Sequence, residues 1–119
     1  MKTGLVLLCL IVIPGIVFAD ADGPDYWEVR DVAADDVLNI RTEADWRSEK
    51  VGEIPADGRC IKNLGCVGGL TFDEFRTLSD AEQQKMLKKR PRWCEIEYHG
   101  VRGWVAGRYL REGEVPCDQ

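Results

Sequence analysis

Four cysteines in the last sixty residues constrain the fold of this chain more than any other feature. Their spacings are six, 28 and 23 residues, between Cys60, Cys66, Cys94 and Cys117. The paired two-residue gaps that are typical of a structural zinc site are absent from this series. In an exported chain, an even number of cysteines predicts disulfides. Two disulfides are therefore expected, provided that the chain leaves the cytoplasm.

The first nineteen residues have the pattern of a cleavable export signal. Lys2 gives a positive start, residues 4–13 are uncharged and mostly Leu, Val and Ile, and Pro14-Gly15 follows. Val17-Phe18-Ala19 then has the short residues that a signal peptidase requires, so we expect cleavage after Ala19. The apolar run is shorter than the about 20 residues that cross a bilayer, so no permanent membrane anchor is expected. The predicted location is the periplasm or the extracellular space.

Cleavage would leave residues 20–119 as the mature chain, without Cys9. Because the signal contains one charged residue, Lys2, 15 Lys and Arg then stand against 21 Asp and Glu, a net charge of −6. Nucleic-acid binding needs a basic surface that displaces counterions, so a nucleic-acid partner is not expected. About a hundred residues are enough for one domain.

Short alternating segments separated by turns predict a mostly β domain over residues 27–117, preceded by a flexible polar leader at 20–26. Strands are expected at 27–32, 37–41, 51–54, 60–66, 93–98 and 101–110. The residues 55–58 and His99-Gly100 are typical turns. Short strands with turns every eight to twelve residues indicate a small barrel or sandwich.

Residues 68–92 have a different character and predict a helical insert. Thr71 with Glu74, and Ser79 with Glu82, each form the sequence pattern of a helix capping box. The second helix is expected at 80–89, because Pro91 disfavours helix at the residue before it. Five positive charges in 85–92 contrast with a net charge of −8 over residues 20–58. This asymmetry either steers a partner or docks the insert against its own barrel, and docking is the simpler interpretation.

Four blocks of the sequence resemble the bacterial Src-homology-3-like domain, SH3b. The resemblance covers about Trp27 to Leu110, apart from the insert, and implies a small, strongly bent SH3-like antiparallel barrel. The blocks are Leu38-Asn39-Ile40-Arg41, Val51-Gly52-Glu53-Ile54-Pro55-Ala56-Asp57-Gly58, Trp93-Cys94-Glu95-Ile96, and Gly103-Trp104-Val105 with Arg108-Tyr109-Leu110.

The barrel that this resemblance implies also indicates how the cysteines pair. On an extended strand, Cys60 and Cys66 would lie roughly 20 Å apart, beyond the roughly 7 Å limit for a disulfide. The strand that begins at Cys94 runs antiparallel to the one that ends at Cys66, so these two cysteines are expected to pair. Cys60 is then left to pair with Cys117.

The sequence gives little indication of catalysis, so we expect neither enzymatic activity nor a cofactor or bound metal. His99 lies five positions after Cys94, so their side chains face opposite ways on one strand, and Cys94 is expected to be oxidised. Glu95 and Glu97 share an outward face, which indicates a solvated surface. Residues 20–25 begin like a calcium loop but lack its closing Glu.

Exposed aromatic and arginine side chains predict a ligand groove. Trp46 lies in the polar loop 42–50, and with Tyr109 it would provide stacking surfaces, while Arg41 or Arg108 would bind carboxylates. The SH3b resemblance implies the ligand class, namely cell-wall peptide or an envelope protein partner. The predicted function is therefore a non-enzymatic exported binding module.

An alternative hypothesis makes the insert the working part of a structural or inhibitory envelope protein. In that case the apolar residues of the insert face another protein. These residues are Phe72, Phe75, Leu78, Met86 and Leu87.

Overall fold

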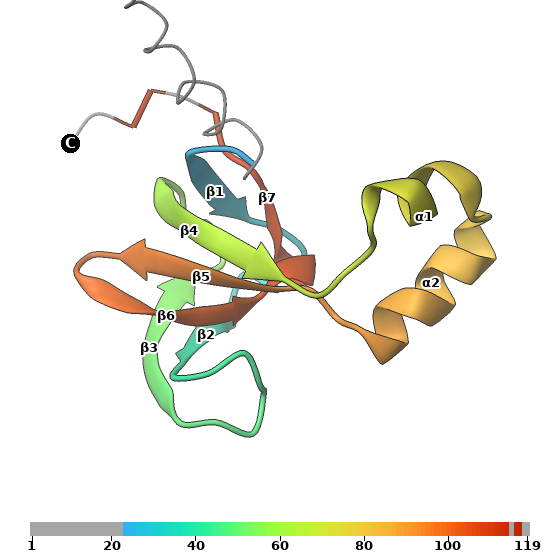
Figure 1. Cartoon of the computed structure of the whole chain (residues 1–119). Helices are drawn as coiled ribbons and strands as arrows, with labels where there is room; N and C mark the ends of the chain where they lie inside the picture. The colour runs from blue at the N-terminus through green and yellow to red at the C-terminus, as the bar shows by residue number, and fades with distance from the viewer. Residues whose placement is uncertain (1–22, 115, 118–119) are drawn as a thin grey trace, which may run out of the picture.

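The computed structural model describes residues 23–114 and 116–117 (Figure 1). The predicted export signal, with its cleavage after Ala19, lies outside the described residues, as does the first part of the predicted leader. Within the described part of the chain, no helix has the length and apolar character needed to span a membrane.

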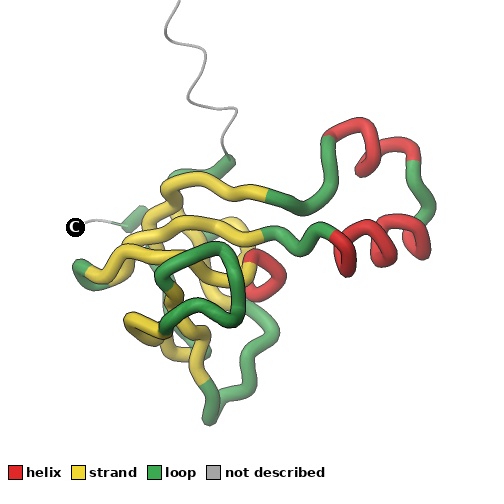
Figure 2. Tube along the Cα trace, turned by 60° about the horizontal axis from the view of Figure 1, so that its bottom comes forward, coloured by secondary structure: helices red, strands yellow, loops and turns green. Residues whose placement is uncertain are grey.

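The domain is mostly β and consists of one curled antiparallel sheet, called the barrel below, with two short helices beside it (Figures 1 and 2). The strands lie in the order β3-β2-β6-β5-β4-β1-β7. Their bounds are β1 Tyr26–Val29, β2 Val37–Arg41, β3 Lys50–Pro55, β4 Ile61–Val67, β5 Trp93–Tyr98, β6 Val101–Ala106 and β7 Leu110–Glu112.

The central hairpin of the sheet joins β5 to β6 through His99-Gly100. Both residues have positive φ, 47° and 83°, which is the backbone conformation that a tight two-residue hairpin requires. Six registered pairs connect the strands, from Trp93 opposite Ala106 to Tyr98 opposite Val101. The turn predicted at His99-Gly100 is present.

The core of the barrel is made by side chains from all seven strands. Ile40, Ile54, Ile61, Ile96 and Val105 are fully buried. The alternation predicted for β2 is visible in its burial, because Leu38 and Ile40 are buried while the residues between and beside them are half-buried. Because successive side chains of a strand point to opposite faces of the sheet, one face of each strand points into the core of the curled sheet.

Both predicted disulfides are present in the structure. Cys66 on β4 lies directly opposite Cys94 on β5, with their Cα atoms 3.9 Å apart. Cys60 precedes β4 and is bonded to Cys117, which follows the last strand, with a Cα separation of 5.5 Å. The first disulfide closes the base of the insert, and the second fastens the C-terminal segment to the barrel.

The helical insert forms as predicted, with helices α1 (Phe72–Thr77) and α2 (Asp80–Lys89). Each begins with a complete capping box, in which the Thr71 or Ser79 hydroxyl accepts from the amide three residues later and the Glu74 or Glu82 carboxylate accepts in return. These contacts satisfy amides that a helix start leaves without partners.

The prediction that the insert docks against its own barrel is wrong. No residue of α1 or α2 is buried, and the helices extend away from the sheet (Figures 1 and 2). Part of the positive charge is instead used within the insert, where Arg90 is paired with Glu74. The helices therefore lack the large apolar contact that would hold them on the barrel.

Several strand ends differ from the sequence expectation, and three of these differences come from local turns. β1 ends at Val29, and Asp31 has a left-handed φ of 57°, so Val32 is outside the strand. Cys60 also has a φ of 57° and lies before β4. The predicted last strand is divided by the 3₁₀ helix η2 (Gly107–Tyr109) into β6 and β7. In each case a local turn interrupts a run whose side-chain pattern still alternates.

Candidate ligand groove between the barrel and the insert

An open groove of about 1190 Å³ lies between one end of the barrel and the insert. We call it the insert groove. Its lining comes from the connection between β1 and β2, from β2 itself, from the loop 42–49, from both helices of the insert, and from η2. Segments far apart in the sequence therefore share one concave surface.

All four residues predicted for the ligand groove line the insert groove: Arg41, Trp46, Arg108 and Tyr109. The Trp46 side chain is 65% exposed, which is unusual for so large an apolar ring. The Arg108 guanidinium lies over the Tyr109 ring, 5.1 Å from its centroid. The structure brings these four side chains to one surface, and their binding of a ligand remains a prediction.

The loop that carries Trp46 is fixed by Ser48. The Ser48 hydroxyl accepts from the amide of Glu43 and donates to carbonyl oxygens of Glu43 and Asp45, the latter at 2.7 Å. Arg41 donates from Nη1 to the Ser48 carbonyl at 3.1 Å. Arg41 therefore helps to fix the conformation of the loop and also adds positive charge to the groove.

The insert provides the apolar wall of the same groove. Phe72 and Phe75 on α1 and Leu87 on α2 are among its lining residues, and the two phenylalanine side chains are 73% and 63% exposed. Leu78 and Met86, which the alternative hypothesis grouped with them, line a separate depression of about 220 Å³. The predicted apolar face of the insert is therefore divided into two surfaces.

Arg92 is a half-buried cation of the insert groove. Its guanidinium donates from Nη2 to the Gly107 carbonyl at 2.6 Å and lies over the Trp27 ring at 5.1 Å. A Cβ at position 107 would lie 2.5 Å from the Arg92 Nε, so only glycine leaves room for this arrangement. Burial, together with the nearby positive charge of Arg30, lowers the pKa of Arg92.

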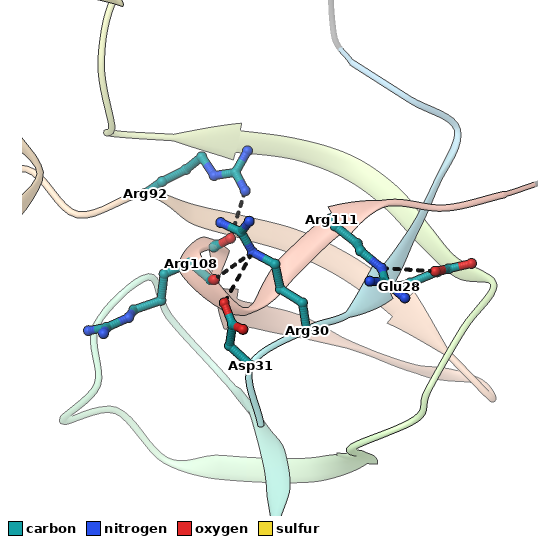
Figure 3. Close-up of polar contacts among 7 residues, drawn as sticks. Glu28, Arg30, Asp31, Arg92, Arg108 and Arg111 are labelled. Carbon is teal, nitrogen blue, oxygen red and sulfur yellow. Dashed lines mark hydrogen bonds and ion pairs between the residues drawn. The ribbon is translucent and has the colours of Figure 1, made fainter. Parts of the chain in front are cut away.

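Arg30 reaches the same 3₁₀ turn from the other side. It donates from Nε to the Arg108 carbonyl at 3.2 Å, and its Nε is 3.8 Å from a carboxylate oxygen of Asp31. Figure 3 shows the guanidinium groups of Arg30 and Arg92 converging on this turn, while the Arg108 side chain points away from both. Two arginines from distant parts of the chain are thus held by adjacent carbonyl groups.

Sequence reasoning did not identify Arg30 and Arg92 as site residues. In the sequence, Arg92 is one of the five positive charges in 85–92, and Arg30 lies within the strand expected at 27–32. The sequence feature that could have indicated the role of Arg92 is Gly107, which immediately precedes Arg108-Tyr109-Leu110. A glycine beside a turn often marks the close approach of another group.

The cationic side chains of the groove are suited to holding anions. Its lining includes four arginines, whose guanidinium groups stay protonated and hold anions rather than transfer protons. The four cysteines in the described residues are all in disulfides, so none provides a thiolate. No cluster of three or more His, Cys, Asp or Glu with metal-binding geometry occurs in residues 23–114 or 116–117.

The domain is therefore a small curled antiparallel sheet with an open groove that contains aromatic and cationic side chains. A comparison with protein-family models matches residues 36–111, more than half of the chain, to the bacterial SH3 domain. The chain belongs to this family, whose members are generally binding modules. No curated protein and no solved structure showed significant similarity to the chain.

Proposed function

We propose that this protein is an exported, non-enzymatic binding module that recognises cell-wall peptide or an envelope protein through the insert groove. Membership of the bacterial SH3 family supports the binding role and makes cell-wall peptide the first ligand to test. The two disulfides support export, because they form and persist in oxidising compartments.

The observation that carries this proposal is the composition of the groove. Trp46, Phe72 and Phe75 are large rings that stay more than 60% exposed, and all three line the same concave surface as several arginines. Exposed aromatics beside cations provide stacking surfaces for peptide or sugar rings and donors for carboxylates. Exposed rings contribute little to the stability of the fold, so the composition of this surface fits ligand binding.

Co-sedimentation of the purified protein with isolated peptidoglycan tests the proposal. Trp46→Ala should weaken binding about tenfold, because truncating a central aromatic contact typically costs more than about 1 kcal/mol. Val51→Ala is the matched control, since Val51 is 42% exposed and does not line the groove. Absence of any binding by the unsubstituted protein to peptidoglycan would remove the cell-wall form of the proposal.

A second candidate function, capture or inhibition of an envelope protein through the outer side of the insert, is favoured by the separate depression at Leu78 and Met86. Matched substitutions separate the two functions. Phe75→Ser should reduce wall binding and spare protein capture, while Met86→Ser should do the reverse. Deleting residues 70–92 while keeping both cysteines should weaken both kinds of binding, because the insert forms one wall of the groove and carries the depression at Leu78 and Met86.

A further inference from the structure

We infer that Arg30 and Arg92 form a carboxylate-binding pair at the barrel end of the insert groove, and that the ligand is an extended peptide that presents a carboxylate there. This inference rests on the proposed function, since it names the chemical group that the same groove recognises. It assigns the recognition of the anion to residues other than Arg41 and Arg108.

The first support is that both guanidinium groups are held in place before any ligand arrives. Arg92 is fixed by the Gly107 carbonyl and the Trp27 ring, and Arg30 by the Arg108 carbonyl. Both residues line the insert groove. A fixed planar guanidinium loses little conformational entropy when it binds a carboxylate, so preorganisation favours binding.

The second support is that the positive charge of the pair is poorly compensated. In the described part of the chain, no carboxylate forms an ion pair with Arg92, and the only one near Arg30 is that of Asp31, at 3.8 Å from Nε. Two other arginines of the barrel differ in this respect, because Arg102 is paired with Glu95 at 2.9 Å and Arg111 with Glu28 at 3.1 Å. An anion bound at the pair would offset the free-energy cost of burying the Arg92 charge and would reduce the repulsion between the two cations.

The third support concerns the kind of anion. Asp31 and Asp36 also line the groove, so a polyanion such as a phosphate polymer would meet repulsion along its length. A single carboxylate would meet less repulsion than a polyanion, and the aromatic wall formed by Phe72, Phe75 and Trp46 provides contacts for apolar side chains of a peptide. Two planar forks also match the geometry of a carboxylate.

Nuclear magnetic resonance of the arginine Nε–H groups tests the pair directly, in the protein with both disulfides formed. Sodium acetate is the probe, with sodium chloride and inorganic phosphate at equal ionic strength as the other arms. Acetate should shift the Arg30 and Arg92 signals with saturation and leave Arg102 unchanged. The carboxylate assignment would be overturned if acetate shifted Arg102 equally or gave no saturable shift at the pair. It would also be overturned if phosphate gave a saturable shift at the pair and acetate did not.

Substitutions then connect the pair to peptide binding. Arg30→Gln removes an arginine whose side chain is 49% exposed, so the fold should persist, and affinity for soluble peptides released from digested peptidoglycan should fall about tenfold. Arg92→Lys keeps the charge without the fork and should abolish the acetate-induced shift at Arg30. Arg102→Gln is the matched control and should leave affinity unchanged.

The two tests separate failure of the inference from failure of the proposed function. If acetate binds at the pair but wall peptides do not bind the protein, the proposed function fails and the carboxylate site stands. If wall peptides bind and neither Arg30→Gln nor Arg92→Lys weakens them, the carboxylate assignment fails and the proposed function stands.

Discussion

The barrel and the insert follow different rules of construction although they are continuous in sequence. The barrel buries its apolar side chains, as Ile40, Ile54 and Ile96 show with no exposed surface. The insert buries none of its helical residues, and Phe72 remains 73% exposed. The barrel is therefore stabilised by tertiary packing, while the insert depends on helix caps, local ion pairs and the disulfide at its base.

This difference indicates what each region contributes to the groove. The barrel provides positions that are fixed by the sheet and by the 3₁₀ turn, including those of Arg30 and Arg92. The insert provides an apolar wall whose position is only weakly determined by packing. Regions of low local stability are where movement on binding is expected, so we expect the insert to be the part of the groove that would adapt to a ligand.

The largest effects are expected from the disulfides. In the chain-entropy model, replacing Cys60 and Cys117 by Ser removes a constraint over a sequence separation of 57 and lowers the free energy of unfolding by about 4 kcal/mol. Replacing Cys66 and Cys94, separated by 28, costs about 3.5 kcal/mol. Urea unfolding measures both values.

The two double variants should also differ in which region loosens. Hydrogen exchange of residues 72–89 should accelerate strongly only when Cys66 and Cys94 are replaced, because that disulfide closes the base of the insert. Equal acceleration in both variants would show that the insert is not controlled separately from the barrel.

A smaller but still large difference is expected between core and insert truncations. Ile96→Ala should lower the free energy of unfolding by about 3 kcal/mol, since Ile96 is fully buried on β5. Phe75→Ala should change it by less than about 0.5 kcal/mol, because that ring is 63% exposed. A cost above about 2 kcal/mol for Phe75→Ala, measured by the same urea titration, would mean that the insert packs on the barrel in solution.

Loss of a helix cap should have a local effect of about 1 kcal/mol. Ser79→Ala removes the hydroxyl that accepts from the Glu82 amide, so α2 should lose helical content by circular dichroism. The melting temperature of the barrel, followed by tryptophan fluorescence, should stay unchanged. Ser48→Ala serves as a comparison, because Ser48 orders the Trp46 loop and not a helix. A barrel that melts at a lower temperature in Ser79→Ala would contradict the independence of the insert.

The smallest effect expected is a pH dependence that differs between the two regions. The pKa of Glu28 is lowered below 4.5 because its carboxylate accepts from the Glu114 amide and pairs with Arg111. The folded state thus binds this proton more weakly than the unfolded state does. The resulting stability is fully present above about pH 4.5 and is lost as the pH falls through the lower folded pKa.

Urea midpoints measured from pH 6 to pH 3 check this dependence, and Glu28→Gln should flatten the curve. The pKa of Glu74 in the insert is also lowered, through the Thr71 amide and Arg90. Glu74→Gln should nevertheless leave the barrel midpoints unchanged, because its contacts lie within the insert. A curve for Glu28→Gln that follows the unsubstituted protein would remove the proposed role of Glu28.

The features that could be predicted from the sequence depend on local chemistry or on a short period. The capping boxes at Thr71 and Ser79, the turn at His99-Gly100 and the opposition of Cys66 to Cys94 all follow from neighbouring residues or from strand register. The four predicted groove residues also line one surface, because the SH3b blocks with Arg41, Arg108 and Tyr109 lie at the same end of the barrel as the loop that carries Trp46.

The remaining features depend on tertiary relations that no local pattern encodes. Arg92 reaches the 3₁₀ turn because Gly107, fifteen residues later, lacks a Cβ, and this contact is set by the fold. The sequence also did not predict that the insert extends away from the barrel. Opposite charges in the insert and in residues 20–58 indicate attraction, but they do not show whether apolar surfaces of the insert and the barrel pack together. The sequence also did not show that Leu78 and Met86 lie on a different surface from Phe72 and Phe75. Two short helices present more than one face, and which residues share a face depends on how the helices are arranged.

The closure of the insert has a consequence for engineering. Val67 and Trp93 are paired neighbours on β4 and β5, and the Cys66–Cys94 disulfide lies one pair further into the sheet. Whatever sequence lies between these two positions must therefore begin and end at the same place. We therefore expect insertions, deletions or a transplanted peptide to be accepted there without altering the strand register.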